Sequence, residues 1–134
     1  MKISLNARTA FTLAALLSTM PATANSGAKT IGGVYPLKLG IYVQNGTECK
    51  GAPNAAMREY NGRGISDPHT HACIARVLTR RGQRYSIMQS CVDAGTGPAP
   101  RVSEQQLVTV LNATSFSIKT NGPGTTYRFC PKGF

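Results

Sequence analysis

From Val34 onward, apolar and polar residues alternate with a period of two, which is typical of β-strands that bury one face. Glycine or asparagine interrupts the alternation about every 8 to 12 residues, the spacing of turns between short antiparallel strands. The pattern predicts strands over residues 39–44, 56–61, 73–79, 84–91, 102–111, 115–119 and 125–130. Little helix is expected, although the sequence SEQQ at residues 103–106 resembles a helix start and leaves a short helix over 105–108 as an alternative.

Turn-forming residues at 80–83, 112–113 and 121–124 join successive strands directly. Short connections of this kind produce an antiparallel meander. We therefore expect an all-β fold, a small antiparallel meander of about six to eight short strands that closes into a barrel or barrel-like sheet.

Alternation also assigns faces to the predicted hairpin over residues 73–91. The expected inward positions are Cys73, Ala75, Val77, Tyr85, Ile87, Gln89 and Cys91. A turn centred on Gly82 places Cys73 opposite Cys91, close enough for a disulfide. Counting strand reversals in a meander places Cys49 and Cys130 together at the other end, where a second disulfide would help to close the sheet.

The first residues have the form of an export signal. Lys2 and Arg8 are followed by an apolar run over 10–20 and by Ala-Thr-Ala at 22–24. We expect a cleaved signal peptide at 1–24, a flexible leader at 25–33 and one disulfide-stapled β domain at 34–134. The apolar run is too short for a transmembrane span, so the mature protein is expected in the periplasm or secreted. An even number of cysteines in such a compartment favours disulfides over free thiols.

Removal of Lys2 and Arg8 leaves 13 basic residues against five acidic ones, a net charge of +8. Such a domain attracts anions. In an exported protein the expected partner is an anionic envelope component or an acidic protein, and no nucleic acid is expected there. We expect a monomer. The alternative is that the charge only keeps the protein soluble.

The basic residues concentrate in the hairpin over 75–85, where Arg76, Arg80, Arg81 and Arg84 are expected on the outward face or at the tip. Guanidinium groups suit phosphates and carboxylates. Leu78 and Met88 lie among these arginines and add apolar contact. A solvated tip without a ligand is the alternative. Arg58 and Arg63 extend the basic surface, and Arg128 joins it if the last strand lies beside the hairpin.

The sequence SDPHTHAC at 66–73 raises the question of a metal site. On a strand, His69, His71 and Cys73 would point the same way, and zinc or copper accepts such ligands. However, Cys73 is expected in a disulfide, and Pro68 favours a turn. We therefore expect an exposed loop before the strand and no cofactor.

Glu59 with His69 or His71 supplies a candidate acid and base for a small secreted hydrolase of the nuclease type. No Gly-x-Ser-x-Gly elbow or Ser-x-x-Lys motif is present. The primary expectation is a binding domain without enzymatic activity, and the nuclease-like hydrolase is the alternative.

Four segments, at residues 46–49, 52–56, 60–65 and 127–131, resemble small exported two-disulfide proteins of Gram-negative bacteria. That resemblance implies an exported disulfide-bonded domain and assigns no activity. The expected architecture is also similar to that of periplasmic inhibitors of C-type lysozyme. Their Ser-Gly-x-x-Tyr loop is absent here, and a domain at +8 would be repelled by a basic lysozyme. A periplasmic inhibitor or a structural accessory protein remains a further alternative.

Overall fold

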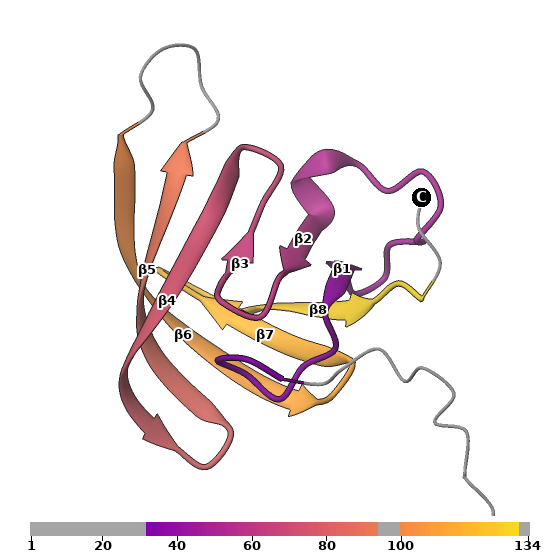
Figure 1. The fold of residues 1–134 in the computed structure, drawn as a ribbon. Coiled ribbons are helices and arrows are strands. Elements are labelled where there is room, and N and C mark those ends of the chain that lie inside the picture. Colours follow the sequence, from indigo (N-terminus) through magenta and orange to yellow (C-terminus); the bar gives the residue numbers. More distant parts are fainter. Residues whose placement is uncertain (1–31, 94–99, 132–134) are drawn as a thin grey trace, which may run out of the picture.

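A computed structural model describes residues 32–93 and 100–131 as one eight-stranded antiparallel sheet (Figure 1). The predicted signal peptide and residues 25–31 of the predicted leader lie outside the described residues. The elements are β1 (Gly40–Gln44), η1 (Asn54–Ala56), β2 (Met57–Tyr60), β3 (Ile65–Ser66), β4 (Thr70–Arg81), β5 (Arg84–Asp93), β6 (Arg101–Asn112), β7 (Ser115–Lys119) and β8 (Thr125–Phe129).

The sheet order is β3-β2-β1-β8-β7-β6-β5-β4, so strands adjacent in the chain pair in the sheet, except β3 and β4, which form its two ends. β1 also pairs with β8, which joins the first and last strands of the meander. The sheet curls until β3 comes beside β4 (Figure 1). The predicted all-β, nearly closed barrel with little helix is therefore confirmed. We call the junction of β3 and β4 the seam.

All seven predicted strands are present, with three differences in detail. β3 was not predicted, because two residues are too few to show alternation. Residues 54–56 form the 3-10 turn η1 rather than the start of β2. The alternative helix over 105–108 is wrong, because β6 pairs continuously with β5 from Arg101 to Thr109 and that ladder satisfies its backbone.

The core at the hairpin end of the barrel is aromatic. Tyr35, Tyr42, Tyr60, Tyr85 and Phe116 are among the side chains that are fully buried or nearly so. The Tyr35 ring meets the Tyr85 ring edge to face, with centroids 5.2 Å apart. Burial raises the pKa of Tyr35, Tyr42 and Tyr60 above the usual value for tyrosine.

The segment over 32–37 is attached to the barrel through Tyr60. The Tyr60 hydroxyl accepts a hydrogen bond from the Tyr35 backbone N–H at 2.8 Å, and its own proton faces the Gly32 carbonyl at 2.9 Å. The Val34 N–H donates to the Gly62 carbonyl at 2.9 Å. Gly33 has a φ of +94°, and a Cβ there would lie 2.1 Å from the Gly62 oxygen, so only glycine fits.

The seam is held by a side chain instead of a regular ladder. The Gln89 amide, buried inside the barrel, accepts from the Ile65 N–H at 3.0 Å and donates to the Ile65 carbonyl at 2.7 Å. One direct backbone bond, from the Ala75 N–H to the Arg63 carbonyl at 2.8 Å, lies beside it. Gly64 packs so closely on Cys73 that an added Cβ would lie 2.7 Å from the Cys73 carbonyl carbon.

The hairpin between β4 and β5 contains two irregularities. Arg81 pairs with Arg84, so the turn is the two residues Gly82 and Gln83, and a bulge at Leu78 then shifts the register by one. Val77 consequently faces Ile87, as predicted, although the predicted turn centre was off by half a residue. The second irregularity contains Ala72, which has a φ of 49°.

Both disulfides pair as expected, Cys73 with Cys91 and Cys49 with Cys130. The Cα atoms of Cys73 and Cys91 are 4.1 Å apart across the hairpin. The predicted inward positions are buried except for Val77, which is 41% exposed. Val77 pairs with the buried Ile87 and so lies on the predicted side, but its predicted burial was wrong, because no strand lies beside β4 beyond Ala75 to cover the side chain.

Replacing Gln89 with leucine tests the seam. The Gln89→Leu variant has a side chain of similar size but no amide, so the Ile65 N–H and carbonyl are left buried without partners. We therefore expect the free energy of unfolding to fall by about 3 kcal/mol. Urea denaturation with both disulfides intact measures this. Gln105→Leu, an exposed position on the neighbouring strand, is the control and should change stability by no more than about 0.5 kcal/mol. Equal losses in the two variants would contradict the role of Gln89.

The buried tyrosines predict alkaline sensitivity. Their raised pKa values mean that the unfolded chain ionises near pH 10 while the folded chain does not, so stability is complete below about pH 10 and is lost as pH rises toward the folded values. We expect a falling thermal midpoint above about pH 10, with the tyrosinate absorbance of Tyr35, Tyr42 and Tyr60 appearing together with unfolding. Ionisation of all five tyrosines near pH 10 in the folded protein would contradict this prediction.

Candidate binding surface

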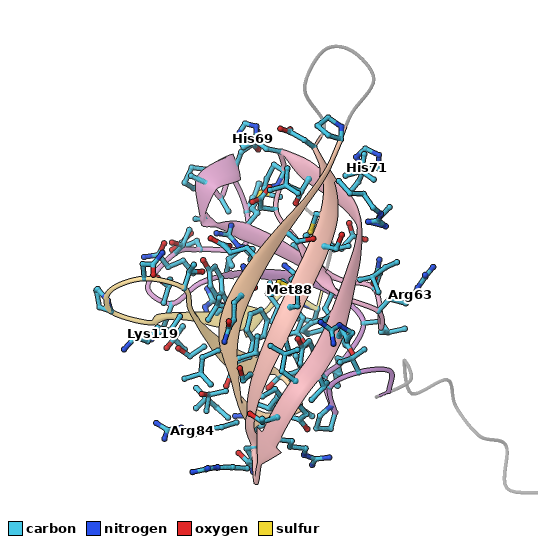
Figure 2. The ribbon with its side chains drawn as sticks, turned by 90° about the vertical axis from the view of Figure 1, so that its left-hand side faces the viewer. Arg63, His69, His71, Arg84, Met88 and Lys119 are labelled. Carbon is cyan, nitrogen blue, oxygen red and sulfur yellow. A yellow bond between two sulfur atoms is a disulfide. The ribbon has the colours of Figure 1, made fainter. Side chains whose placement is uncertain are left out.

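The outward face of the β4–β5 hairpin carries three of the four predicted arginines. Arg81 pairs with Arg84 at the tip, and Arg76 pairs with Met88 further along. These side chains lie opposite to the inward set of Tyr85, Ile87 and Gln89. Figure 2 shows Arg84 and Met88 on the side that β4, β5 and β6 present to solvent.

Arg80 differs from the prediction. It pairs with Tyr85 on the inward side, and its guanidinium lies 4.9 Å from the centre of the Tyr85 ring. Its Nε donates to the Gly82 carbonyl at 3.0 Å. The Leu78 bulge changes which residues face inward near the tip, so Arg80 covers the end of the aromatic core instead of joining the outward set.

The three outward arginines are free of partners within the described part of the chain. No hydrogen bond or ion pair occupies the guanidinium of Arg76, Arg81 or Arg84 in residues 32–93 and 100–131. The outward positions of β4 to β7 that carry charge in those residues are all basic, namely Arg76, Arg81, Arg84, Arg101 and Lys119. Glu104 is on β6 but pairs with Gln89 and faces inward. We call Arg76, Arg81 and Arg84 with their apolar neighbours the basic face.

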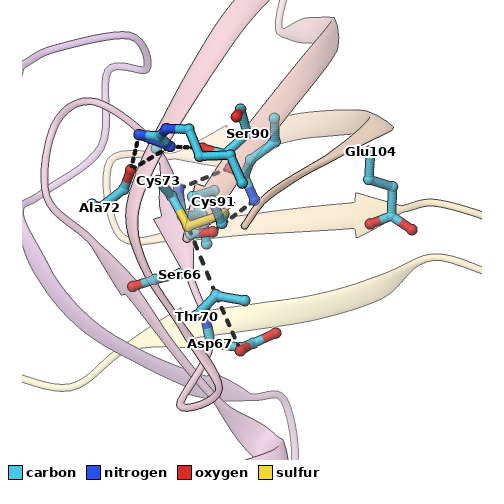
Figure 3. The surroundings of a disulfide bond; sticks show 12 residues. Ser66, Asp67, Thr70, Ala72, Cys73, Ser90, Cys91 and Glu104 are labelled. Carbon is cyan, nitrogen blue, oxygen red and sulfur yellow. Dashed lines mark hydrogen bonds between the residues drawn. A yellow bond between two sulfur atoms is a disulfide. The ribbon is translucent and has the colours of Figure 1, made fainter. Parts of the chain in front are cut away.

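Arg101 has a structural role. Its guanidinium donates to the Ala72 carbonyl at 2.9 Å and to the Ser90 carbonyl at 3.2 Å. These bonds hold the irregular stretch of β4 beside the Cys73–Cys91 disulfide, around which Figure 3 places Ala72 and Ser90. The guanidinium of Arg101 is therefore hydrogen-bonded to backbone carbonyls, whereas, among the described residues, those of Arg76, Arg81 and Arg84 are not.

Exposed apolar side chains lie among the outward arginines. Ile74 is 39% exposed and Leu78 is 37% exposed, on either side of Arg76 along β4. Met88 is half-buried beside Arg76. The basic face thus presents guanidinium groups and aliphatic surface together.

Arg58 and Arg128 do not extend this face. Arg58 turns to the barrel mouth, where its guanidinium lies 5.0 Å from the Tyr127 ring. Arg128 lies on β8, between β1 and β7 and not beside β4, and donates to the Thr47 carbonyl at 2.6 Å. Arg63 lies on the β2–β3 turn, away from the tip residue Arg84 in Figure 2, but its carbonyl accepts from the Ala75 N–H, which places it across the seam from the Arg76 end of the face.

The residues of SDPHTHAC do not converge on a metal. The His69 N–H donates to Asp67 Oδ1 at 2.8 Å in a tight turn, whereas His71 already lies in β4. Figure 2 shows the two histidine side chains on different sides of this end of the barrel. Cys73 is bonded to Cys91, and residues 32–93 and 100–131 contain no group of three or more metal-ligating side chains.

Glu59 and His71 do line one groove, with a volume of about 340 Å³. Met57, Ser66 and Asp67 also line it, and His69 does not. The candidate acid–base pair from the sequence is therefore reduced to Glu59 with His71, both of them exposed.

Comparison of the chain with protein-family models, with curated proteins and with solved structures finds no match in any of the three. The two disulfides fit an extracellular or otherwise oxidising compartment. Among the described residues, no helix has the length and apolar character needed to cross a bilayer.

The different roles of the arginines predict different effects on stability. The double variant Arg81→Gln/Arg84→Gln should keep the free energy of unfolding within about 0.5 kcal/mol of the parent, because neither side chain has a partner to lose. Arg101→Gln should lower it by about 1 kcal/mol or more, because bonds to two backbone carbonyls are lost. Chemical denaturation of each variant checks this, and a double variant less stable than Arg101→Gln would contradict the assignment.

Proposed function

We propose that the protein binds an anionic lipid surface of the cell envelope through the basic face. The observation that carries the proposal is the group of three unpartnered arginines on a part of the barrel whose outward charges are all basic. Phosphate groups on lipids or lipopolysaccharide match guanidinium donors in charge and geometry.

The exposed aliphatic side chains favour a lipid surface over an acidic protein as the partner. Ile74 and Leu78 flank Arg76, so a surface that offers phosphates above an apolar layer satisfies both kinds of group at once. The expected location supports this, since the signal peptide predicted at 1–24 and the two disulfides fit a periplasmic or secreted protein. The protein acts as a binding domain in this proposal and catalyses no reaction.

The expected affinity is modest and electrostatic. Each arginine near an anionic membrane surface contributes about 1 kcal/mol, so three contribute about 3 kcal/mol before any apolar contact is added. Such binding weakens with salt, because the Debye length falls to about 8 Å at physiological ionic strength.

Vesicle co-sedimentation tests the proposal with phosphatidylglycerol vesicles and with neutral phosphatidylcholine vesicles. We expect binding to the anionic vesicles only. Arg81→Gln/Arg84→Gln should weaken it roughly 30-fold, the equivalent of two arginine contacts. The matched control is Lys38→Gln/Lys50→Gln, which removes the same charge from positions outside the basic face and should weaken binding by less than about threefold.

Three outcomes would overturn the proposal. The first is equal binding to neutral vesicles, and the second is an equal loss of affinity in the two double variants, which would mean that net charge alone acts. The third is binding to soluble polyglutamate without binding to anionic vesicles, which would make an acidic polypeptide the partner.

A further inference from the structure

The interior of the barrel changes from apolar to polar along its axis. Near the hairpin tip the inward residues of β5 and β6 are Tyr85 and Val108, which pair with each other. Further along, Ile87 pairs with Gln106 and Gln89 pairs with Glu104. Polar side chains inside a small barrel are costly unless they have partners, so this end of the interior differs in kind from the core.

A cavity of about 330 Å³ occupies the polar end, between the end of β5, the start of β6 and the turn that joins β7 to β8. We call it the mouth cavity. Its volume lies in the range of small-molecule sites, about 300 to 1,000 Å³. The lining residues used below are Arg58, Asp67, Glu104, Gln106, Thr125 and Tyr127.

Gln106 lines this cavity, and its amide oxygen is an acceptor that lacks a donor and is shielded from the cavity in this conformation. Its Nε2 donates to Glu104 Oε2 at 2.8 Å, which fixes the amide, and its Oε1 is buried with no hydrogen-bond partner in the described part of the chain. A buried acceptor of this kind is destabilising unless a donor reaches it. The amide oxygen and the amide NH₂ of Gln89, the other inward glutamine, are both hydrogen-bonded to the Ile65 backbone.

The charged groups of the lining are largely committed within the protein. Arg58 Nη1 donates to the Ala55 carbonyl at 3.2 Å, and its guanidinium covers the Tyr127 ring. Asp67 Oδ1 accepts from the His69 N–H and from Thr70 Oγ1. The charged groups in the lining are the carboxylates of Asp67 and Glu104 and the guanidinium of Arg58, so negative charge exceeds positive charge there. The mouth cavity therefore disfavours the anions that the basic face attracts.

We propose that the mouth cavity binds a small, uncharged, hydroxyl-rich ligand of the size of a mono- or disaccharide. One sugar hydroxyl donates to the exposed Glu104 carboxylate, and the Gln106 side chain turns so that its Oε1 accepts from a second, which supplies the donor that this oxygen lacks. Hydroxyls also accept hydrogen bonds, which suits the threonine and amide groups of the lining. This inference stands on the cavity alone and is independent of lipid binding by the basic face.

NMR titration of the oxidised, isotope-labelled protein with maltose and with N-acetylglucosamine tests the proposal. We expect saturable shifts of the side-chain amide signals of Gln89 and Gln106 with at least one of these sugars. Gln106→Leu removes the acceptor and should weaken binding roughly tenfold. Gln105→Leu, which changes the outward face of the same strand, should leave the affinity unchanged, as should Arg81→Gln/Arg84→Gln.

Thermal unfolding of Gln106→Leu separates a binding effect from misfolding, and Glu104→Gln provides a second variant that keeps the shape of the side chain. The proposal is overturned if neither sugar shifts the two amide signals, or if Gln106→Leu folds and binds the sugar as tightly as the parent does. It is also overturned if glucuronate or putrescine binds in place of the neutral sugars, because charge would then be the feature recognised.

Discussion

The seam between β3 and β4 closes the barrel and determines where β4 becomes an exposed edge. β3 has two residues and cannot form a full ladder with β4, so the Gln89 amide supplies the hydrogen bonds that Ile65 would otherwise lack. Gly64 allows the two backbones to come into contact at Cys73, and the Cys73–Cys91 disulfide and Arg101 hold the facing stretch of β4. Gln89 also lines the mouth cavity, so the polar closure and the polar end of the interior share this residue.

The exposure of the basic face follows from where the seam ends. β4 continues past Ala75 to Arg81, but no strand lies beside this part, so Val77 and Leu78 are left exposed on an edge strand. Exposed edges promote aggregation by pairing with other chains, and positive charges together with a bulge at Leu78 oppose such pairing. The same arginines that protect the edge from other strands thus present an unpartnered cationic surface, while the anion-disfavouring cavity lies at the opposite end of the barrel.

Most of the fold was predictable from the sequence, because period-two alternation and turn residues act locally. The pairing of Cys73 with Cys91 followed from the hairpin register. The turn was predicted half a residue away from Gly82 and Gln83, but the bulge at Leu78 restored the expected alignment. The inward position of Arg80 and the exposure of Val77 were not predictable, because both depend on that bulge and on where β3 stops. The mouth cavity was missed for a similar reason. Gln106 and Glu104 show as inward only once β6 is registered against β5, although the polar residues Gln89, Glu104 and Gln106 at alternating positions were a signal that the interior could not be wholly apolar.

We propose that the molecule meets an anionic lipid surface with the outward face of its β4–β5 hairpin. Paramagnetic broadening of backbone amide signals by spin-labelled lipid in phosphatidylglycerol vesicles maps this contact without changing any residue. Broadening should be strongest over residues 76–88 and weak over residues 120–125, which lie at the mouth cavity. Broadening centred on residues 57–66, or spread evenly over all eight strands, would contradict it.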